Sequence, residues 1–313
     1  MTGTLWFIVP MYFDVDAFLI LRQRLTDVVS TAAPTKDVTV SFVAVDDTAG
    51  CDPEVARLAD MEDTQVVTPL FNLGHQRAIV YGVRRMTPLI ADDDIIVTLD
   101  ADGEDRPEDL PELLAPILSS DAYDHSVALA RRTHREESIP FKAWYLLFRI
   151  LFRTLTGTTV RTGNYAAYRG RVARRTLFHP SFDLCYSSTF LSLDVQRHLV
   201  PCPRGTRYAG TSRMNTGRLA MHGLRMLMPF LDRIAIRALA FFLALFSVGV
   251  LASLAIVAIR LMTDSAIPGW ATYTVLLLGV LSFVALGNFI ILFSIFSQSR
   301  ANSSTSEEAN GPT

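Results

Sequence analysis

Short apolar runs alternate with amphipathic stretches along residues 1–132, and this alternation predicts strands alternating with helices. The predicted strands span 5–12, 38–47, 64–70, 94–102 and 125–132, and the predicted helices span 15–29, 54–61, 74–86 and 107–119. Such an order predicts an α/β fold with a Rossmann-like, mostly parallel and doubly wound sheet. In these sheets ligands bind beyond the carboxyl ends of the strands. The charged residues expected there are Asp46, Asp47, Asp100, Asp102, Arg131 and Arg132.

Two long uncharged stretches dominate the C-terminal part of the chain. Residues 238–259 form a run of 22 without a charge, and residues 265–299 form a run of 35. A helix of 22 residues is about 33 Å long, enough to cross a hydrocarbon core of about 30 Å. The sequence therefore predicts a hairpin of transmembrane helices at 236–260 and 270–297. The polar end, 298–313, is expected to be a disordered tail.

Two apolar segments with scattered basic residues precede the first predicted span. In residues 141–156, Lys142, Arg149 and Arg153 fall on one side of a helix. Residues 214–235 are similar and lead into the span. We expect both to be amphipathic helices at a membrane surface, with ordinary packing helices as the alternative. The catalytic domain would then comprise residues 1–213, followed by a juxtamembrane helix at 214–235.

Charge is distributed unevenly along the chain. Residues 1–125 carry 8 basic and 23 acidic side chains, whereas residues 126–237 carry 19 basic and 5 acidic ones. An acidic half beside a basic half indicates that the protein holds a metal ion and an anion. The basic residues share their segments with the expected membrane-surface helices, so nucleic acid is not expected as a partner.

The cysteines and the residues before the first span indicate the cellular compartment of the catalytic domain. Cys51, Cys185 and Cys202 lack the spacing of a zinc site or a disulfide framework, which favours a reducing environment. The N-terminal apolar run is too short for a signal peptide and lacks a basic leader. Arg233 and Arg237 directly precede the uncharged run at 238–259, in agreement with the positive-inside rule. We therefore expect the catalytic domain on the cytosolic face.

Asp100 and Asp102 directly follow a predicted strand, so both side chains can leave the sheet on the same side. Two neighbouring carboxylates repel each other unless a divalent cation screens them. Mg²⁺ and Mn²⁺ accept oxygen ligands and leave coordination positions for phosphate oxygens. Glu104 could supply a third carboxylate, and Asp105 either caps the next helix or faces the acceptor. The sequence therefore predicts a site for Mg²⁺ or Mn²⁺ at this strand end.

Five segments, FIVPMYFD, AVDD, NLGHQRAIVYGV, LDADGEDRPEDL and ALARRTHR, stand in the order and spacing seen in family 2 glycosyltransferases with the GT-A fold. Over residues 4–215 the chain resembles the branch that contains dolichol-phosphate mannose synthases and bacterial undecaprenyl-phosphate glucosyltransferases. The resemblance implies an integral protein of the bacterial inner membrane that moves a sugar from a nucleoside-diphosphate sugar to a polyprenyl phosphate, with inversion. Such an enzyme could also form a homo-oligomer.

The resemblance also assigns roles to individual residues. Those matched to donor nucleotide binding are Pro10, Tyr12, Asp14, Asp46, Asp47, Asn72, Gly74, Arg77, Asp100 and Ala101. The matched catalytic positions are Asp102, Asp105 and Asn164. The matched positions for the acceptor or donor phosphates are Arg132, Arg135 and Arg213. The matched metal ligands are Asp100, Asp102 and Glu104.

The chain departs from the family pattern at several of these positions. Phe13 and Asp14 stand where the family has Asn-Glu, and His75 stands in place of Lys. Asn164 and Ala166 replace an acid and an arginine, so residue 164 is no longer a candidate base. A lipid phosphate has a second pKa of about 6 and is largely a dianion at neutral pH. It therefore needs positioning and charge relief more than deprotonation.

Three functions are compatible with the sequence. The first is the polyprenyl-phosphate glycosyltransferase described above. The second keeps the enzyme class but uses another membrane lipid or a polysaccharide as acceptor. The third is a non-catalytic membrane protein that binds sugar nucleotides, for which the departures at Asn164 and Ala166 are the main argument.

Overall fold

The computed structural model describes residues 3–32, 38–119, 125–132, 139–160, 162–208, 216–263 and 269–309. These residues form two compact units, the first ending at Pro229 and the second beginning at Phe230. Each unit is described by itself below.

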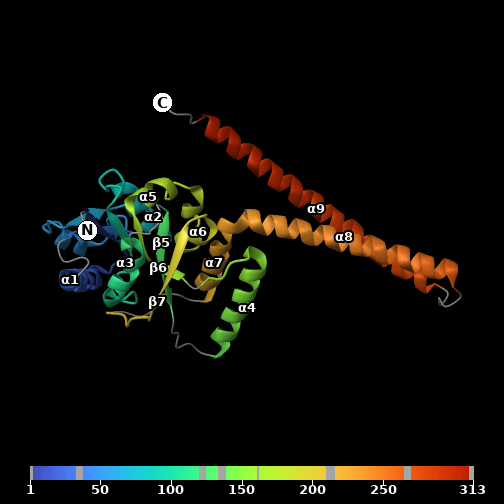
Figure 1. Cartoon of the computed structure of the whole chain (residues 1–313), viewed down its shortest axis with the longest axis horizontal. Coiled ribbons are helices and arrows are strands. Elements are labelled where there is room, and N and C mark those ends of the chain that lie inside the picture. Colours follow the sequence, from blue (N-terminus) through green and yellow to red (C-terminus); the bar gives the residue numbers. More distant parts are fainter. Residues whose placement is uncertain are drawn as a thin grey trace. The chain divides into compact units, whose positions relative to one another are not determined.

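One mixed sheet forms the centre of the first unit (Figure 1). Its strands are β1 (Thr4–Met11), β2 (Thr39–Asp46), β3 (Thr64–Val67), β4 (Ile95–Thr98), β5 (Ser126–Arg132), β6 (Thr162–Arg169) and β7 (Gln196–Cys202). Their order across the sheet is β3-β2-β1-β4-β6-β5-β7. Neighbouring strands run parallel except at β6, which is antiparallel to both β4 and β5. The predicted α/β class, with a mostly parallel sheet, is confirmed.

Helices cover both faces of this sheet, which makes it doubly wound. On one face, α1 (Val15–Thr31) and α3 (Leu110–Leu118) bury their apolar side chains in a core that includes Phe7 and Phe42. The rings of Phe7 and Phe42 stack with centroids 5.1 Å apart. On the other face lie α2 (His75–Met86) and α6 (Tyr186–Ser192), which contact each other.

The remaining elements of the first unit are short turns and three further helices. They are η1 (Pro53–Leu58), η2 (Pro107–Asp109), α4 (Ile139–Thr156), α5 (Gly170–Thr176), η3 (Pro180–Asp183), α7 (Thr216–Leu227) and η4 (Met228–Phe230), the last spanning the unit boundary. α4 and α7 contact each other, and a β carbon at Gly223 would lie 3.1 Å from the Phe148 ring. On α4, Leu146, Leu147 and Ile150 are more than half exposed.

Several predicted elements are shorter than expected. The strand predicted at 64–70 ends at Val67, before Pro69. The strand predicted at 94–102 ends at Thr98, because the following residues form turns in which carboxylates accept hydrogen bonds from backbone N–H groups. The helix predicted at 54–61 is the 3₁₀ turn η1, which the Asp52 carboxylate caps by accepting a 3.0 Å bond from the N–H of Glu54.

The second unit consists of α8 (Leu231–Met262) and α9 (Trp270–Ala309), which pack along each other. Among the described residues, the two helices that contain these segments are long and apolar enough to cross a membrane. They approach closely at Gly249, where a β carbon would lie 2.1 Å from Oγ of Ser282. α9 continues to Ala309, so residues 298–309 are helical where the sequence suggested a disordered tail. Extending an existing helix costs much less than starting one.

Gly82 lets α2 lie close to the sheet, and this gives a first prediction. A β carbon at Gly82 would lie 2.5 Å from Cγ2 of Val45 and 2.9 Å from Cγ2 of Ile8. We expect Gly82→Ala to lower the free energy of unfolding by about 1–3 kcal/mol through overpacking, although alanine favours a helix by about 1 kcal/mol. Thermal unfolding of the full chain measures the change. Adding Val45→Ala should recover part of the loss, and a higher melting temperature for Gly82→Ala alone would contradict the prediction.

Candidate active site

Asp100, just beyond the end of β4, is held by side chains from two other elements. Oδ1 of Asp100 lies 2.8 Å from Nε2 of His75 and accepts a 3.1 Å hydrogen bond from Nδ2 of Asn164. His75 opens α2, and Asn164 is on β6, the antiparallel neighbour of β4. Burial disfavours the ionised carboxylate, but His75 and Arg132 outweigh it and hold the pKa of Asp100 well below its usual range.

The orientation of the Asn164 amide follows from a backbone group. The N–H of Ser187 can only donate, and it donates a 2.9 Å hydrogen bond to Oε1 of Gln76. The NH₂ of Gln76 therefore points the other way, where it donates to Oδ1 of Asn164. This leaves the NH₂ of Asn164 facing Asp100. Asn164, 8% exposed, is thus a hydrogen-bond donor to Asp100.

Asp102 and Glu104 lie against two arginines from the segment after β7. Arg204 forms a two-pronged pair with Glu104, with nitrogen–oxygen distances of 2.6 and 3.0 Å. Arg207 reaches Oε1 of Glu104 at 2.8 Å and Oδ2 of Asp102 at 3.0 Å. Burial opposes ionisation of Glu104, but the two arginines lower its pKa below the usual value. Burial and the charge of Asp100 raise the pKa of Asp102.

Asp105 is buried beside Asp100 and does not cap the following helix. Its Oδ2 accepts a 3.1 Å hydrogen bond from the N–H of Asp100, and its Oδ1 lies 3.4 Å from Nη2 of Arg132. Burial and the charge of Asp100 raise the pKa of Asp105 to about 7. The sequence left open whether Asp105 caps the following helix or faces the acceptor. The position of its side chain beside Asp100 favours a role in the acidic cluster over a helix cap.

Two glycines bring the acidic turn and the arginine segment together. Gly103 has a φ of +85°, and a β carbon there would lie 2.6 Å from the ring of Tyr208. A β carbon at Gly205 would lie 2.3 Å from the backbone oxygen of Gly103. Side chains at either position would separate the two segments, and Arg204 and Arg207 would lose their reach to Glu104.

The carboxylates of Asp46 and Asp47, at the end of β2, are bound to nearby N–H groups. Asp46 accepts hydrogen bonds from the N–H groups of Thr48, at 3.0 Å, and Gly50, at 3.1 Å. Asp47 accepts from those of Leu73, at 2.7 Å, and Gly74, at 3.0 Å. Burial raises the pKa of Asp47, while these two N–H groups oppose the change. The two acids therefore shape the loops beside the strand ends.

The other positions matched to nucleotide binding lie along the same strand ends. Asn72 donates a 2.8 Å hydrogen bond from Nδ2 to the backbone oxygen of Asp47. Pro10 is buried within β1, and Ala101 is buried between the two metal-candidate acids. Tyr12 is 44% exposed, and Asp14 is exposed where it precedes α1.

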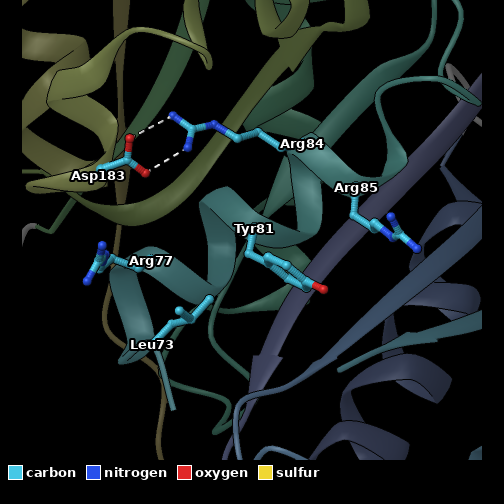
Figure 2. Close-up of a pocket in the computed structure, with 6 residues that line it drawn as sticks. All are labelled: Leu73, Arg77, Tyr81, Arg84, Arg85 and Asp183. Atoms are coloured by element: carbon cyan, nitrogen blue, oxygen red, sulfur yellow. Dashed lines mark hydrogen bonds and ion pairs between the residues drawn. The ribbon is translucent and has the colours of Figure 1, made fainter. Parts of the chain in front are cut away.

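Arg77 lies apart from this cluster. It lines a cavity on the outer face of α2 (Figure 2). At 100° per residue of helix, Arg77 lies about 200° around the axis from His75, which faces Asp100. The structure therefore does not bring Arg77 to Asp100. The remaining predicted arginines, Arg135 and Arg213, lie outside the described residues.

Four residues of the site were given no role in the sequence analysis, namely His75, Gln76, Arg204 and Arg207. His75 carried a signal, since it replaces a lysine within the matched motif. Arg204 and Arg207 stand in the segment RGTRY just after β7, at the end of a strand that the sequence analysis did not predict.

Asp100 and Asp102 carry the carboxylate oxygens that a divalent cation prefers, and their role as its ligands stays a prediction. Among the described residues, no group of three or more His, Cys, Asp or Glu side chains is arranged to hold a metal. Mg²⁺, however, is commonly bound by one or two carboxylates together with substrate phosphates. Burial and, after it, the charge of Asp100 raise the pKa of Asp102, as is expected for a buried carboxylate near another one. Arg207 pairs with Asp102 as well as with Glu104, and Arg204 pairs with Glu104 too, so the part of Glu104 as a third ligand stays a prediction.

Residues 6–177 match the family model described as Glycosyl transferase family 2. A similar protein is undecaprenyl-phosphate 4-deoxy-4-formamido-L-arabinose transferase of Klebsiella pneumoniae (strain 342), 27% identical over 292 residues that cover 90% of this chain and 83% of that protein. The Yersinia enterocolitica protein of the same name is 26% identical over 194 residues, covering 59% of this chain and 53% of that protein.

Solved structures show weaker similarity. The mannosyltransferase PcManGT of Pyrobaculum calidifontis, in complex with GDP-Man and Mn²⁺, is 14% identical with a TM-score of 0.44, over 98% of this chain and 89% of that one. Mannosyl-3-phosphoglycerate synthase of Rubrobacter xylanophilus is 13% identical with a TM-score of 0.46, over 74% of each chain. Similarity at this level indicates no specific activity. The match of the family model over more than half of the chain shows that the protein is a glycosyltransferase and belongs to glycosyl transferase family 2.

Proposed function

We propose that the protein transfers a sugar, with inversion, from a nucleoside-diphosphate sugar to a polyprenyl phosphate at the cytosolic face of a bacterial inner membrane. The observation that carries the proposal is the side-by-side placement of acids and arginines beyond β4. Asp100 and Asp102 supply oxygens for a cation, and Arg132, Arg204 and Arg207 supply guanidinium groups for phosphates. A diphosphate donor and a phosphate acceptor require both kinds of group.

The acceptor class rests on two further observations. The relatives from Klebsiella pneumoniae and Yersinia enterocolitica carry undecaprenyl phosphate in their names. The chain also has helices apolar enough to cross a membrane, and Leu146, Leu147 and Ile150 of α4 are exposed. We infer that α4 and α7 lie in the membrane surface, where a lipid phosphate becomes accessible to the domain.

Asp100 and Asp102 would hold Mg²⁺ or Mn²⁺, which when bound supplies positive charge to the diphosphate leaving group. The protein side chains position the two substrates. Arg132 lies 3.4 Å from Asp105 and 3.7 Å from Glu104, which keeps its guanidinium group in the site as a contact for phosphate oxygens. The donor amide of Asn164 and the ring of His75 hold Asp100 in its ionised form.

The reaction needs no protein base. An oxygen of the acceptor phosphate, already a dianion for much of the time at neutral pH, forms the new bond to the anomeric carbon. The bond from that carbon to the nucleoside diphosphate breaks, and the diphosphate leaves with the electron pair. Attack from the face opposite the leaving group inverts the anomeric configuration. With this chemistry, a family member with asparagine at position 164 would not need a base there.

A reconstituted assay tests the proposal. We expect the purified full chain, supplied with Mn²⁺, a panel of nucleoside-diphosphate sugars and undecaprenyl phosphate, to move labelled sugar into a chloroform-soluble product. EDTA should abolish transfer and an excess of Mn²⁺ or Mg²⁺ should restore it, since removal of the cation leaves the diphosphate charge uncompensated.

The control is the same mixture without the lipid. Transfer to a different membrane lipid or to a polysaccharide would replace the proposed acceptor. Binding of a donor without any transfer would contradict the proposal and favour a sugar-nucleotide-binding protein. Transfer that is unaffected by EDTA would contradict the assignment of a cation to Asp100 and Asp102.

A further inference from the structure

The outer face of α2 carries a cavity of about 340 Å³ (Figure 2). It is lined by Leu73, Arg77, Tyr81, Arg84, Arg85 and Asp183. Arg77, Tyr81 and Arg84 are spaced four and three residues apart, so they follow one face of the helix. We propose that this cavity, the outer α2 cavity, is a second binding site of the protein and takes a phosphate group.

The charge of the outer α2 cavity is unusual for its part of the chain. Residues 1–125 contain 8 basic residues against 23 acidic ones, and three of the 8 line this one cavity. Its single acidic residue, Asp183, is paired with Arg84 at 2.7 and 3.2 Å. Within the described part of the chain, no carboxylate pairs with Arg77 or Arg85, and both are exposed. The cavity therefore presents two positive charges without a counter-charge.

The wall of the cavity is fixed before any ligand binds. Nε of Arg84 donates a 2.8 Å hydrogen bond to the backbone oxygen of Leu177, and its guanidinium group lies 5.7 Å from the centroid of the Phe178 ring. With Asp183 these contacts hold Arg84 in one position. Tyr81 donates a 3.4 Å hydrogen bond to the backbone oxygen of Thr68, which holds the loop before α2 against the helix. Arg77 and Arg85 line the cavity on opposite sides of Tyr81 in Figure 2, and no carboxylate in the described part of the chain pairs with either.

A phosphate group fits these features. Guanidinium groups bind phosphate through paired, charge-assisted hydrogen bonds. The two unpaired arginines match the charge of a phosphate monoester, close to −2 at neutral pH. The acidic cluster at Asp100 offers a different chemistry, and Arg77 lies about 200° around α2 from His75, which faces Asp100.

The ligand would also touch the loop that leads to the candidate active site. Leu73 lines the cavity, and its N–H donates a 2.7 Å hydrogen bond to Asp47. Leu70 and Phe71, on the same loop, are 96% and 63% exposed. A phosphate on a lipid would place apolar chains near these side chains, whereas a free phosphate would leave them in water. The bound phosphate group could therefore belong to a lipid or be free phosphate, and the experiment below distinguishes the two.

The test is calorimetric titration of the full chain in a non-ionic detergent, at constant ionic strength and with EDTA present. The ligands are inorganic phosphate, dihexanoyl phosphatidic acid and dihexanoyl phosphatidylcholine. We expect wild type to bind the first two, and the double variant Arg77→Gln/Arg85→Gln to lose at least tenfold in affinity. The matched control, Arg57→Gln/Arg175→Gln, removes two exposed arginines from other surfaces and should bind as wild type does.

Hydrogen–deuterium exchange locates the site, with protection expected in residues 68–85. Equal affinity for phosphate and phosphatidic acid would identify free phosphate as the ligand class, and tighter binding of phosphatidic acid would identify a lipid. The proposal is overturned if wild type binds neither, if the double variant binds as wild type does, or if protection falls elsewhere. The outcome is independent of the proposed glycosyl transfer, which these titrations do not measure.

Discussion

Asp100→Asn is expected to lower the rate of glycosyl transfer by a factor of about 10²–10³, the usual cost of losing one preorganised electrostatic contact in an active site. Asparagine keeps the size of the side chain and leaves the hydrogen bond from the N–H of residue 100 to Asp105 in place. It removes the negative charge that His75 and Arg132 stabilise. Asp102 would then be alone as an anionic ligand for the cation.

The measurement is the initial rate of sugar transfer, together with Mn²⁺ affinity by electron paramagnetic resonance. Both should fall, because the same carboxylate is expected to serve both. Asp60→Asn is the matched control, since it removes an exposed carboxylate at the protein surface. Transfer by Asp100→Asn at half the wild-type rate or more would exclude Asp100 from the cation site.

The acids at the strand ends could be predicted from the sequence because their positions follow from a local pattern of neighbouring residues. A buried apolar run followed by acids identifies Asp46 and Asp100 as residues at the end of a strand, and β2 and β4 confirm both positions. Parallel pairing of β1 with its two neighbours then brings these ends to one edge of the sheet. No long-range information was needed for this part of the site.

The pairing of Asp100 with Asn164 could not be predicted in the same way. The two residues are 64 positions apart, and they meet because β6 inserts antiparallel between β4 and β5. Strand order depends on how whole segments pack, which a local hydrophobic pattern does not encode. Arg204 and Arg207 were missed for a related reason, since their position depends on the parallel pairing of β7 with β5.

Arg77 shows the opposite difficulty. The motif match assigned it to the nucleotide site, but helical geometry turns its side chain away from Asp100. His75 and Arg77 stand in one matched segment, NLGHQRAIVYGV. Because they are two residues apart on α2, they cannot face the same side of the helix. His75 lies 2.8 Å from Asp100, and Arg77 lines the outer α2 cavity.

Gln76→Glu should lower kcat/KM for glycosyl transfer by about 10–100-fold, as is typical when a residue that orients a metal ligand is changed. The new carboxylate can accept the hydrogen bond from the N–H of Ser187 but cannot donate to Asn164. The amide of Asn164 would therefore turn over and donate to residue 76. Its oxygen would then face Asp100, and Asp100 would exchange a donor for a repelling dipole.

Comparison with Gln76→Met distinguishes this mechanism from a packing effect. Methionine fills a similar volume and forms no strong hydrogen bond. It therefore removes the hydrogen bond to the Asn164 amide without reversing the orientation of that amide. We expect Gln76→Glu to be the more damaging variant, in both transfer rate and Mn²⁺ affinity. If Gln76 only filled space, the isosteric glutamate would be the milder change. In an Asn164→Ala background, Gln76→Glu should have little further effect, because the amide through which it acts is gone. Full additivity of the two changes would show that Gln76 acts on Asp100 by another route.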